Sequence, residues 1–384
     1  MQYEWTLIDA EEGRYVEEWD YDGKAHGWPH LSISMRRLRG GLQDGVEQIV
    51  ISDGDFSWVV LPTRGMSLHH AQLGDWRIGW RSPVRGPVHP AYVPLTEPAG
   101  LGWLSGFDEL FVRCGLESNG APDFNEDKQL THPLHGRIGN TPARKVQINV
   151  DPEDGTVSVT GVVDEARFHF LKLELTATFT AKRGQAGLIV EDTIRNRSAS
   201  PAEAQLLYHI NFGAPLMDGG AQFLAPVKQV VPRNPHAATG IDGWNRYPAP
   251  QPGVEEQVYF LELQAAENGQ TLSMLKDAHA TRAAVIRHHA PSLPCYSLWK
   301  NPTALEDGYV TGLEPGTNFP NPRSFEGEQG RVMKLAPGAS HSMRLALDFL
   351  DQPQAIAKVE HEISTLQGES TPQVHPEPLP DWCS

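Results

Sequence analysis

Cysteine is scarce in this chain. The three cysteines among 384 residues, Cys114, Cys295 and Cys383, are an odd number and show no CxxC spacing. Such a set predicts neither a disulfide framework nor a thiolate zinc site. Because unpaired cysteines are usual in a reducing compartment, we expect a cytoplasmic protein.

Long hydrophobic runs and basic charge are also in short supply. No stretch approaches the roughly 18 apolar residues of a membrane-spanning helix. Residues 1–20 carry acids where an export signal needs a basic start and an apolar centre. The 32 basic residues face 48 acidic ones, a formal net charge of −16, which repels phosphate backbones and anionic membranes. We therefore expect no membrane partner and no nucleic-acid partner.

Helical periodicity is rare as well. Residues 351–367 form the best amphipathic segment, and residues 11–20 could add one or two helical turns. The 36 glycines and 31 prolines are dispersed along the chain, which predicts many short elements joined by turns. With 39% hydrophobic and 21% charged residues, the composition is that of a globular protein. We expect an all-β fold.

Short β-prone runs fill most of the chain. Residues 46–80 predict a meander of antiparallel strands, and residues 81–105, with five prolines, predict a long ordered loop. Residues 144–198 alternate apolar and polar side chains, and further β-rich runs fill residues 203–349. One face of the 144–198 series should be buried, with these residues on it: Leu171, Leu173, Leu175, Ala177 and Phe179.

The continuity of these runs predicts one domain over residues 1–384. Residues 368–384, rich in proline, should form an irregular tail. We expect a monomer or a homodimer.

Signatures of several common enzyme classes are missing. The chain contains no GxGxxG, P-loop, HExxH, GxSxG or EF-hand loop. Nucleotide binding, zinc-protease, α/β-hydrolase and calcium-sensor functions therefore have no local support. The remaining candidates are polar residues at the places where strands meet turns.

A glutamate and a histidine lie within apolar strands. Glu314 lies near the end of the run YVTGLEPG, where an apolar strand leads directly into a Pro/Gly turn. Partial dehydration would raise its pKa toward that of a useful general base; the alternative is a turn-capping or ion-paired acid. His209, in LLYHINFG, suits a general acid near neutral pH, or is a core histidine with satisfied hydrogen bonds.

A third polar cluster occupies the turn THPLHGR, which contains His132 and His135. Proline and glycine restrict this turn, so its side chains can face a ligand at little entropic cost. Two histidines three residues apart can also bind a metal, but no third ligand with diagnostic spacing lies nearby. We therefore assign no metal.

Three segments in this order resemble the galactose mutarotase (aldose 1-epimerase) superfamily. GLEPGTNFPNPR followed by VMKLAPGASHSMRL is similar to its C-terminal signature, YHINFG to its histidine-bearing strand, and PLHGRIGN to its L-H-G-G turn. LPTRGMSLHHAQLGD is weakly similar to its opening hairpin, so the resemblance covers about residues 45–350, which we expect to be the core of the domain. Within the superfamily, the chain most resembles a bacterial branch described as a domain of unknown function. The resemblance implies a β-supersandwich with few short helices and a concave sugar-binding face.

The resemblance also implies roles for individual residues. Glu314 takes the place of the base, His209 that of the acid, and His135 that of a second sugar-contacting histidine. Arg113, in FVRCGLESNG, stands where an arginine contacts the sugar, although a surface ion pair is equally open to it. Asp242, in GIDG, could bind sugar hydroxyls or simply form a turn.

Several neighbouring residues depart from the family pattern. Tyr208 replaces the asparagine before the histidine, and Arg137 stands where the turn has a second glycine. Asn211 and Phe212 are displaced relative to the Y-F-N order. The acid and the base are kept, but the identity of the substrate is left open.

Two further residues could extend the site. Trp299 and Lys300, in YSLWKNP, could add a stacking surface and a cation; a core tryptophan and a surface lysine are the commoner outcome.

The resemblance implies an aldose 1-epimerase-like enzyme. It would interconvert the anomers of a monosaccharide by acid/base ring opening and would need no cofactor. Two alternatives stay open: an isomerase or epimerase of other sugars or keto sugars, with a metal held by His135 and its neighbours, and a non-catalytic carbohydrate-binding protein.

Overall fold

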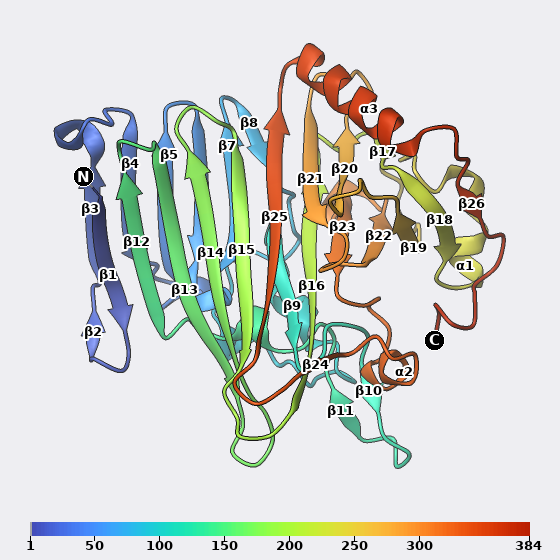
Figure 1. The fold of residues 1–384 in the computed structure, drawn as a ribbon, viewed down its shortest axis with the longest axis horizontal. Coiled ribbons are helices and arrows are strands. Elements are labelled where there is room, and N and C mark those ends of the chain that lie inside the picture. Colours follow the sequence, from blue (N-terminus) through green and yellow to red (C-terminus); the bar gives the residue numbers. More distant parts are fainter. Residues whose placement is uncertain (1) are drawn as a thin grey trace.

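The computed structural model describes residues 2–384, and most of its strands lie in two large sheets (Figure 1). This confirms the expected all-β class. One sheet has ten strands, in the order β17 (Gln222–Leu224), β20 (Gln270–Lys276), β21 (Ala283–His289), β25 (Ser340–Leu350), β15 (Gly187–Asn196), β14 (Lys172–Lys182), β13 (Thr156–Ala166), β12 (Lys145–Asp151), β1 (Tyr3–Asp9) and β2 (Arg14–Tyr15).

The other large sheet has fourteen strands and carries the candidate site. Its order is β26 (Gln373–Val374), β18 (Val227–Pro232), β19 (Gln257–Leu263), β22 (Cys295–Asn301), β23 (Val310–Gly316), β16 (Ala202–Gly213), β9 (Phe111–Leu116), β7 (Ser67–Leu73), β6 (Phe56–Leu61), β5 (Glu47–Asp53), β4 (Leu31–Arg37) and β3 (Glu18–Asp22), with β8 (Trp76–Ile78) beside β7 and β24 (Met333–Leu335) beside β16. A separate small hairpin is formed by β10 (Asp123–Phe124) and β11 (Leu130–His132).

Helices are few and short in the described residues. They are α1 (Pro235–Ala238), α2 (Arg323–Glu328) and α3 (Pro353–Gln367). The helix expected over 351–367 is confirmed: it begins at a proline, whose missing N–H costs nothing in the first turn, and buries Ile356, Val359 and Ile363. Across residues 2–384, none of the helices combines the length and the apolar character that crossing a membrane requires.

The helix expected over residues 11–20 is wrong. This stretch contains β2 and the start of β3. Oδ1 of Asp9 accepts hydrogen bonds from the backbone N–H groups of Glu11 and Glu12, which turns the chain so that β2 pairs back onto β1. A side-chain oxygen that bonds the following amides in this way competes with helix formation.

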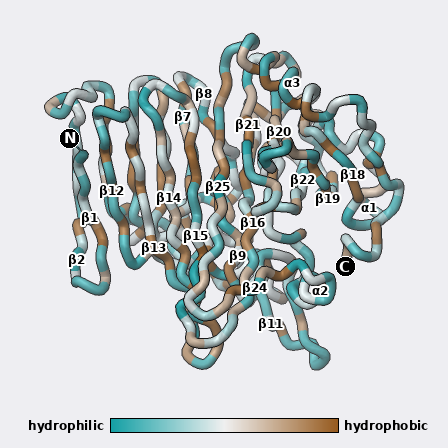
Figure 2. Tube along the Cα trace, viewed as in Figure 1, coloured by the Kyte–Doolittle hydropathy of each residue, from teal (hydrophilic) through white to brown (hydrophobic). Residues whose placement is uncertain are grey.

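The core lies between the two sheets. The five residues expected on one face of the 144–198 series are all buried, and most of them belong to β14. Phe179 on β14 contacts Trp58 and Phe111 of the fourteen-stranded sheet, with ring centroids 6.1 and 5.5 Å apart. Figure 2 shows hydrophobic residues interspersed with hydrophilic ones along the central strands, as expected when one face of each strand is buried.

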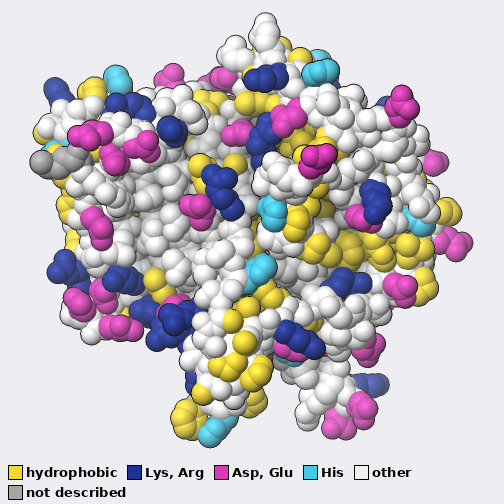
Figure 3. All heavy atoms as spheres, in the orientation of Figure 1, with side chains coloured by type: hydrophobic (Ala, Val, Ile, Leu, Met, Phe, Trp, Pro, Cys, Tyr) yellow, Lys and Arg dark blue, Asp and Glu magenta, His cyan; other side chains and the backbone are white. Residues whose placement is uncertain are grey.

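The opposite face of the ten-stranded sheet is polar but little charged. Thr160 and Thr178 pair across β13 and β14 through a hydrogen bond of 3.0 Å between their hydroxyls. Figure 3 shows mostly uncharged side chains over β12 to β15, with charged side chains gathered at the edges.

The two segments predicted to be irregular, residues 81–105 and 368–384, contain little regular secondary structure. Residues 81–105 form a loop with short 3-10 turns and contain no β-strand. In residues 368–384, only β26 is a strand, and Trp382 packs against Phe319 with ring centroids 4.7 Å apart. The Pro-rich loop is ordered by packing: Trp103 is buried, and its ring centroid lies 4.6 Å from that of Phe107.

Candidate functional site

The candidate site lies on one face of the fourteen-stranded sheet, where β22, β23 and β16 are consecutive neighbours. Trp299 of β22 pairs with Gly312 of β23, and Ser297 pairs with Glu314. Because side chains alternate along a strand, Trp299 and Glu314 project from the same face. His209 of β16 reaches the same space from the other side of β23.

Glu314 and His209 are in direct contact. Oε1 of Glu314 lies 3.2 Å from Nε2 of His209, and the two residues are only 3% and 4% exposed. The angles are not those of a hydrogen bond, and Oε1 is buried without a hydrogen-bond partner. Two residues 105 positions apart in the chain therefore meet at the floor of one pocket. They lie side by side and are not separated by the width of a sugar ring.

Asn211 determines which nitrogen of His209 carries a proton. The amide nitrogen of Asn211 donates hydrogen bonds to the backbone oxygens of Glu109 and His209, at 3.0 and 3.2 Å. Its Oδ1 is thus an acceptor, and it lies 2.6 Å from Nδ1 of His209. Nδ1 must therefore be the protonated nitrogen, which leaves Nε2 of the neutral ring as a proton acceptor facing Glu314.

The environment shifts both groups toward their uncharged forms. Burial raises the pKa of Glu314 well above its usual range, and the nearby carboxylate of Glu256 adds to the rise. Burial lowers the pKa of His209 well below its usual value, and His135 adds to the decrease. The two side chains can share one proton. When the proton is on Glu314, both groups are neutral; when it is on His209, Glu314 is a carboxylate base and His209 is an imidazolium acid.

His135 approaches the pair from the turn after β11. Its Nδ1 donates to the backbone oxygen of Asn119 at 2.9 Å, and burial lowers the pKa of the ring to about 4. The ring is therefore neutral near pH 7, with Nε2 available to accept a hydrogen bond. The ring centroids of His135 and His209 are 5.3 Å apart.

Aromatic side chains form the walls of the pocket. The rings of Trp103, Phe107 and Trp299 lie 5.9, 5.1 and 5.4 Å from the ring of His209, measured between centroids. The pocket has a volume of about 300 Å³ and is lined by Leu101, Trp103, Leu104, Phe107, Ala121, Pro122, Leu134, His135, His209, Arg233, Glu256, Val258, Trp299, Glu314 and Pro320. An apolar pocket with a few converging polar groups is the usual form of a small-molecule site.

Glu256 and Arg233 form a charged rim. Oε2 of Glu256 accepts a hydrogen bond of 2.6 Å from the indole N–H of Trp299. Its Oε1 lies 3.4 Å from the guanidinium of Arg233. The indole is thereby held in one orientation at the edge of the pocket.

Gly312 provides the space that the polar groups occupy. A Cβ atom at this position would collide with Oε1 of Glu314 and would lie 3.0 Å from Cε1 of His209 and 3.2 Å from Cε3 of Trp299. Gly312 has no positive φ, so the close packing of these three side chains is the reason for glycine here.

The structure does not bring Arg113 to the pocket. On β9, Arg113 pairs with Tyr208, the residue before His209, and therefore points to the other face of the sheet. Its side chain is fully buried, donates to Asp192 at 2.5 and 2.8 Å, and donates to the backbone oxygen of Met66 at 2.6 Å. In place of the expected sugar contact, the structure has an ion pair within the core.

Lys300 and Asp242 also lie outside the pocket. Lys300 follows Trp299 on β22 and so faces the opposite way. Its Nζ donates to the backbone oxygens of Gly243 and Arg246, at 3.0 and 2.8 Å. Asp242 is exposed in a short 3-10 turn. The expectation that these two residues contact a sugar is not supported by their positions.

Four of the seven expected site residues thus line one pocket, namely Glu314, His209, His135 and Trp299. Several other residues of the site were not predicted from the sequence: Trp103, Phe107, Asn211, Arg233, Glu256 and Gly312. Asn211 could have been found, because it lies two residues after His209 and therefore on the same face of β16. Glu256 precedes β19 and Arg233 follows β18, and no local motif marks them. Among the described residues, no three His, Cys, Asp or Glu side chains lie close enough together to hold a metal ion.

Residues 43–349 match the family described as Domain of unknown function (DUF4432). No curated protein matches the sequence. A solved structure from Klebsiella pneumoniae, provisionally named an aldose 1-epimerase, is 34% identical, with a TM-score of 0.95 over 99% of both chains.

More distant structures share only the fold. A galactose mutarotase-like protein from Clostridium acetobutylicum is 14% identical, with a TM-score of 0.58 over 84% of this chain and 99% of that one. A galactose 1-epimerase from Lactobacillus acidophilus is 11% identical, with a TM-score of 0.56 over 83% of this chain and 98% of that one. The chain therefore belongs to the DUF4432 family and shares the fold of galactose mutarotase-like proteins.

Proposed function

We propose that this protein is an aldose 1-epimerase that interconverts the anomers of a monosaccharide by opening and closing the sugar ring. The observation that carries the proposal is the contact of 3.2 Å between Oε1 of Glu314 and Nε2 of His209 at the floor of an aromatic pocket. Anomer exchange needs one base and one acid at the same carbon, and this pair supplies both.

Glu314 acts as the base and His209 as the acid. With the shared proton on His209, the carboxylate of Glu314 takes the proton of the C1 hydroxyl while Nε2–H of His209 protonates the ring oxygen. The C1–O5 bond breaks, C1 becomes a carbonyl, rotation exposes its other face, and the reverse transfers close the ring. Because O1 and O5 are both bonded to C1, two groups in contact with each other are well placed to serve them.

The remaining pocket residues hold the sugar. Nε2 of neutral His135 accepts a hydrogen bond from a hydroxyl, because its Nδ1–H is already used by Asn119. Trp103, Phe107 and Trp299 offer ring faces to the C–H surface of the pyranose. A pocket of about 300 Å³ suits a monosaccharide better than a longer chain.

The test is polarimetry of fresh α-anomers across a panel of monosaccharides. We expect the wild-type protein to accelerate the decay of optical rotation of at least one sugar, and Glu314→Gln to reduce kcat/KM about a hundredfold or more, the usual contribution of a positioned base. Glu165→Gln is the matched control. Glu165 is also a buried carboxyl whose pKa is raised by burial, but it does not line the pocket.

Two results would contradict the proposal. One is a wild-type rate no faster than that of Glu314→Gln on every sugar. The other is saturable sugar binding that survives Glu314→Gln while no turnover is detected, which would indicate a binding protein.

A further inference from the structure

A second pocket, of about 450 Å³, lies beyond the end of β16, away from the catalytic pair. It is lined by Asp75, Arg77, Gly79, Trp80, Arg81, Ala214, Pro215, Leu305 and Tyr309. Trp80 separates it from the catalytic pocket: it lines the second pocket, its ring centroid lies 4.8 Å from that of Phe107, and Phe107 lines the first.

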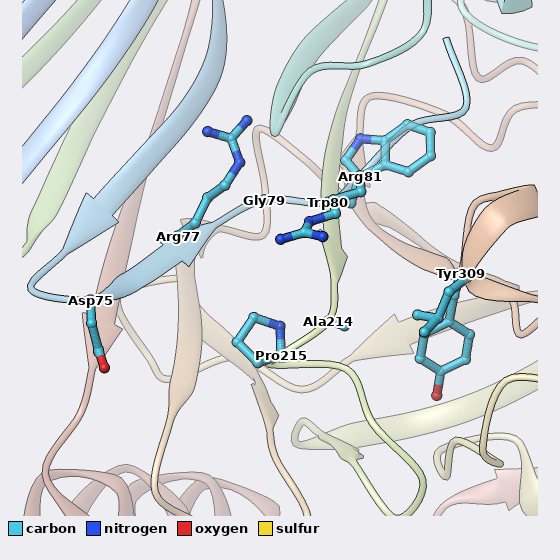
Figure 4. A pocket seen from close by; sticks show the side chains of 9 residues that line it. Asp75, Arg77, Gly79, Trp80, Arg81, Ala214, Pro215 and Tyr309 are labelled. Atoms are coloured by element: carbon cyan, nitrogen blue, oxygen red, sulfur yellow. The ribbon is translucent and has the colours of Figure 1, made fainter. Parts of the chain in front are cut away.

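Two arginines reach this pocket from adjacent parts of the chain. Figure 4 shows Arg77 extending from β8 and Arg81 from the segment that follows, with Pro215 and Tyr309 across the opening. Within residues 2–384, neither guanidinium group has a hydrogen bond or an ion pair, although the carboxylate of Asp108 acts electrostatically on Arg77 at longer range. Asp75 also lines the pocket, but its carboxylate lies 3.7 Å from Arg282.

Unpaired arginines that share a pocket are unusual in this chain. Both side chains are exposed, as is that of Arg195, so the lack of an ion pair does not by itself distinguish them. They differ from Arg197 and Arg323, which also line one pocket together but each contact a carboxylate. Partial burial lowers the pKa of Arg77, the positive charge of Arg81 adds to the decrease, and the carboxylate of Asp108 opposes it. The two like charges repel each other, and a bound anion would relieve that repulsion.

We infer that this pocket binds a phosphate monoester through Arg77 and Arg81. A carboxylate offers two oxygens and a single charge, which one guanidinium satisfies, whereas a phosphate monoester carries up to two charges and three free oxygens that can accept from two guanidinium groups. The pocket is also larger than a phosphate ion. Its apolar wall of Ala214, Pro215 and Leu305 provides a surface for the organic part of an ester.

The test is isothermal titration of the full-length protein with phenyl phosphate, inorganic phosphate and phenol at low salt. Phenyl phosphate has no sugar hydroxyls, so it does not imitate the proposed substrate. We expect one phenyl phosphate per chain, weaker binding of inorganic phosphate and no binding of phenol. Arg77→Ala and Arg81→Ala should each weaken binding about tenfold or more, because each removes charge-assisted hydrogen bonds. Leu305→Asp, at a position that is 53% exposed, should weaken it by charge repulsion.

Two arginine variants serve as controls. Arg195→Ala removes an exposed strand arginine outside the pocket, and Arg233→Ala removes the arginine at the rim of the catalytic pocket. Both should leave phenyl phosphate binding within about twofold of wild type. Three outcomes would overturn the inference: no saturable binding to the wild type, wild-type affinity in the Arg77→Ala, Arg81→Ala double variant, or loss of binding with Arg233→Ala alone.

Discussion

Gly312→Ala should remove most of the epimerase activity while leaving the fold intact. The new Cβ would overlap Oε1 of Glu314 and press on the rings of His209 and Trp299, at 3.0 and 3.2 Å from their nearest atoms. To make room, the carboxylate and the imidazole must move apart. A displacement of about 1 Å in a catalytic group can cost about a hundredfold in rate, and we expect kcat/KM to fall by that order.

The same substitution should have a modest effect on stability. Overpacking by one methyl group costs about 1–3 kcal/mol, and Gly312 has no positive φ that alanine would strain. The assays are polarimetry for kcat/KM and urea unfolding for stability. Gly327→Ala is the matched control, because a Cβ there meets nothing within 4 Å and the backbone is helical. Wild-type kcat/KM in Gly312→Ala would refute the inferred packing of the catalytic pair.

Three further predictions concern the core and pH. Arg113→Met removes the ion-pair partner of the buried Asp192, so the free energy of unfolding in urea should fall by about 3–5 kcal/mol while kcat/KM stays the same. A raised KM with unchanged stability would instead indicate a sugar contact. Asn211→Asp puts a carboxylate against Nδ1 of His209, which favours the imidazolium form. The acidic limb of the pH profile of kcat/KM should therefore move to higher pH. An unchanged profile would contradict the assigned tautomer. Burial lowers the pKa of His288 to about 3, so between pH 6.5 and 3 the unfolded chain binds more protons than the folded one and stability falls as the pH decreases. His288→Phe should reduce this pH dependence of the free energy of unfolding, measured in urea, by up to about 4 kcal/mol. An unaltered pH dependence would exclude His288 as the cause.

The strands could be predicted because a half-buried strand alternates apolar and polar residues along a short stretch of sequence. The alternation of Leu173, Leu175, Ala177 and Phe179 with polar residues has the two-residue period of a sheet, and every one of these side chains is buried. The failed helix over residues 11–20 shows the limit of the same method. Its composition allowed a helix, but the carboxylate of Asp9 bonded the following amides and turned the chain.

Predicted site residues line the pocket only where a sequence motif named the residue and the strand or turn that carries it directed its side chain to the pocket face of the sheet. Glu314, His209 and His135 came from short motifs, and the same alternation that buries half of each strand carried Arg113 and Lys300 away from the pocket. For Lys300 the period alone was sufficient, because Lys300 directly follows Trp299 on one strand. For Arg113 it would have required knowing that this residue pairs with Tyr208 across the sheet.

Local patterning was enough to establish the β class, the amphipathic C-terminal helix and the acid/base candidates, because each depends on neighbours within a few residues. The register between distant strands decided the rest: that Glu314 touches His209, that Gly312 makes room for them, and that Glu256 and Arg233 close the rim. These contacts join segments tens to a hundred or more residues apart, and their free energy comes from packing that exists only once both sheets have formed.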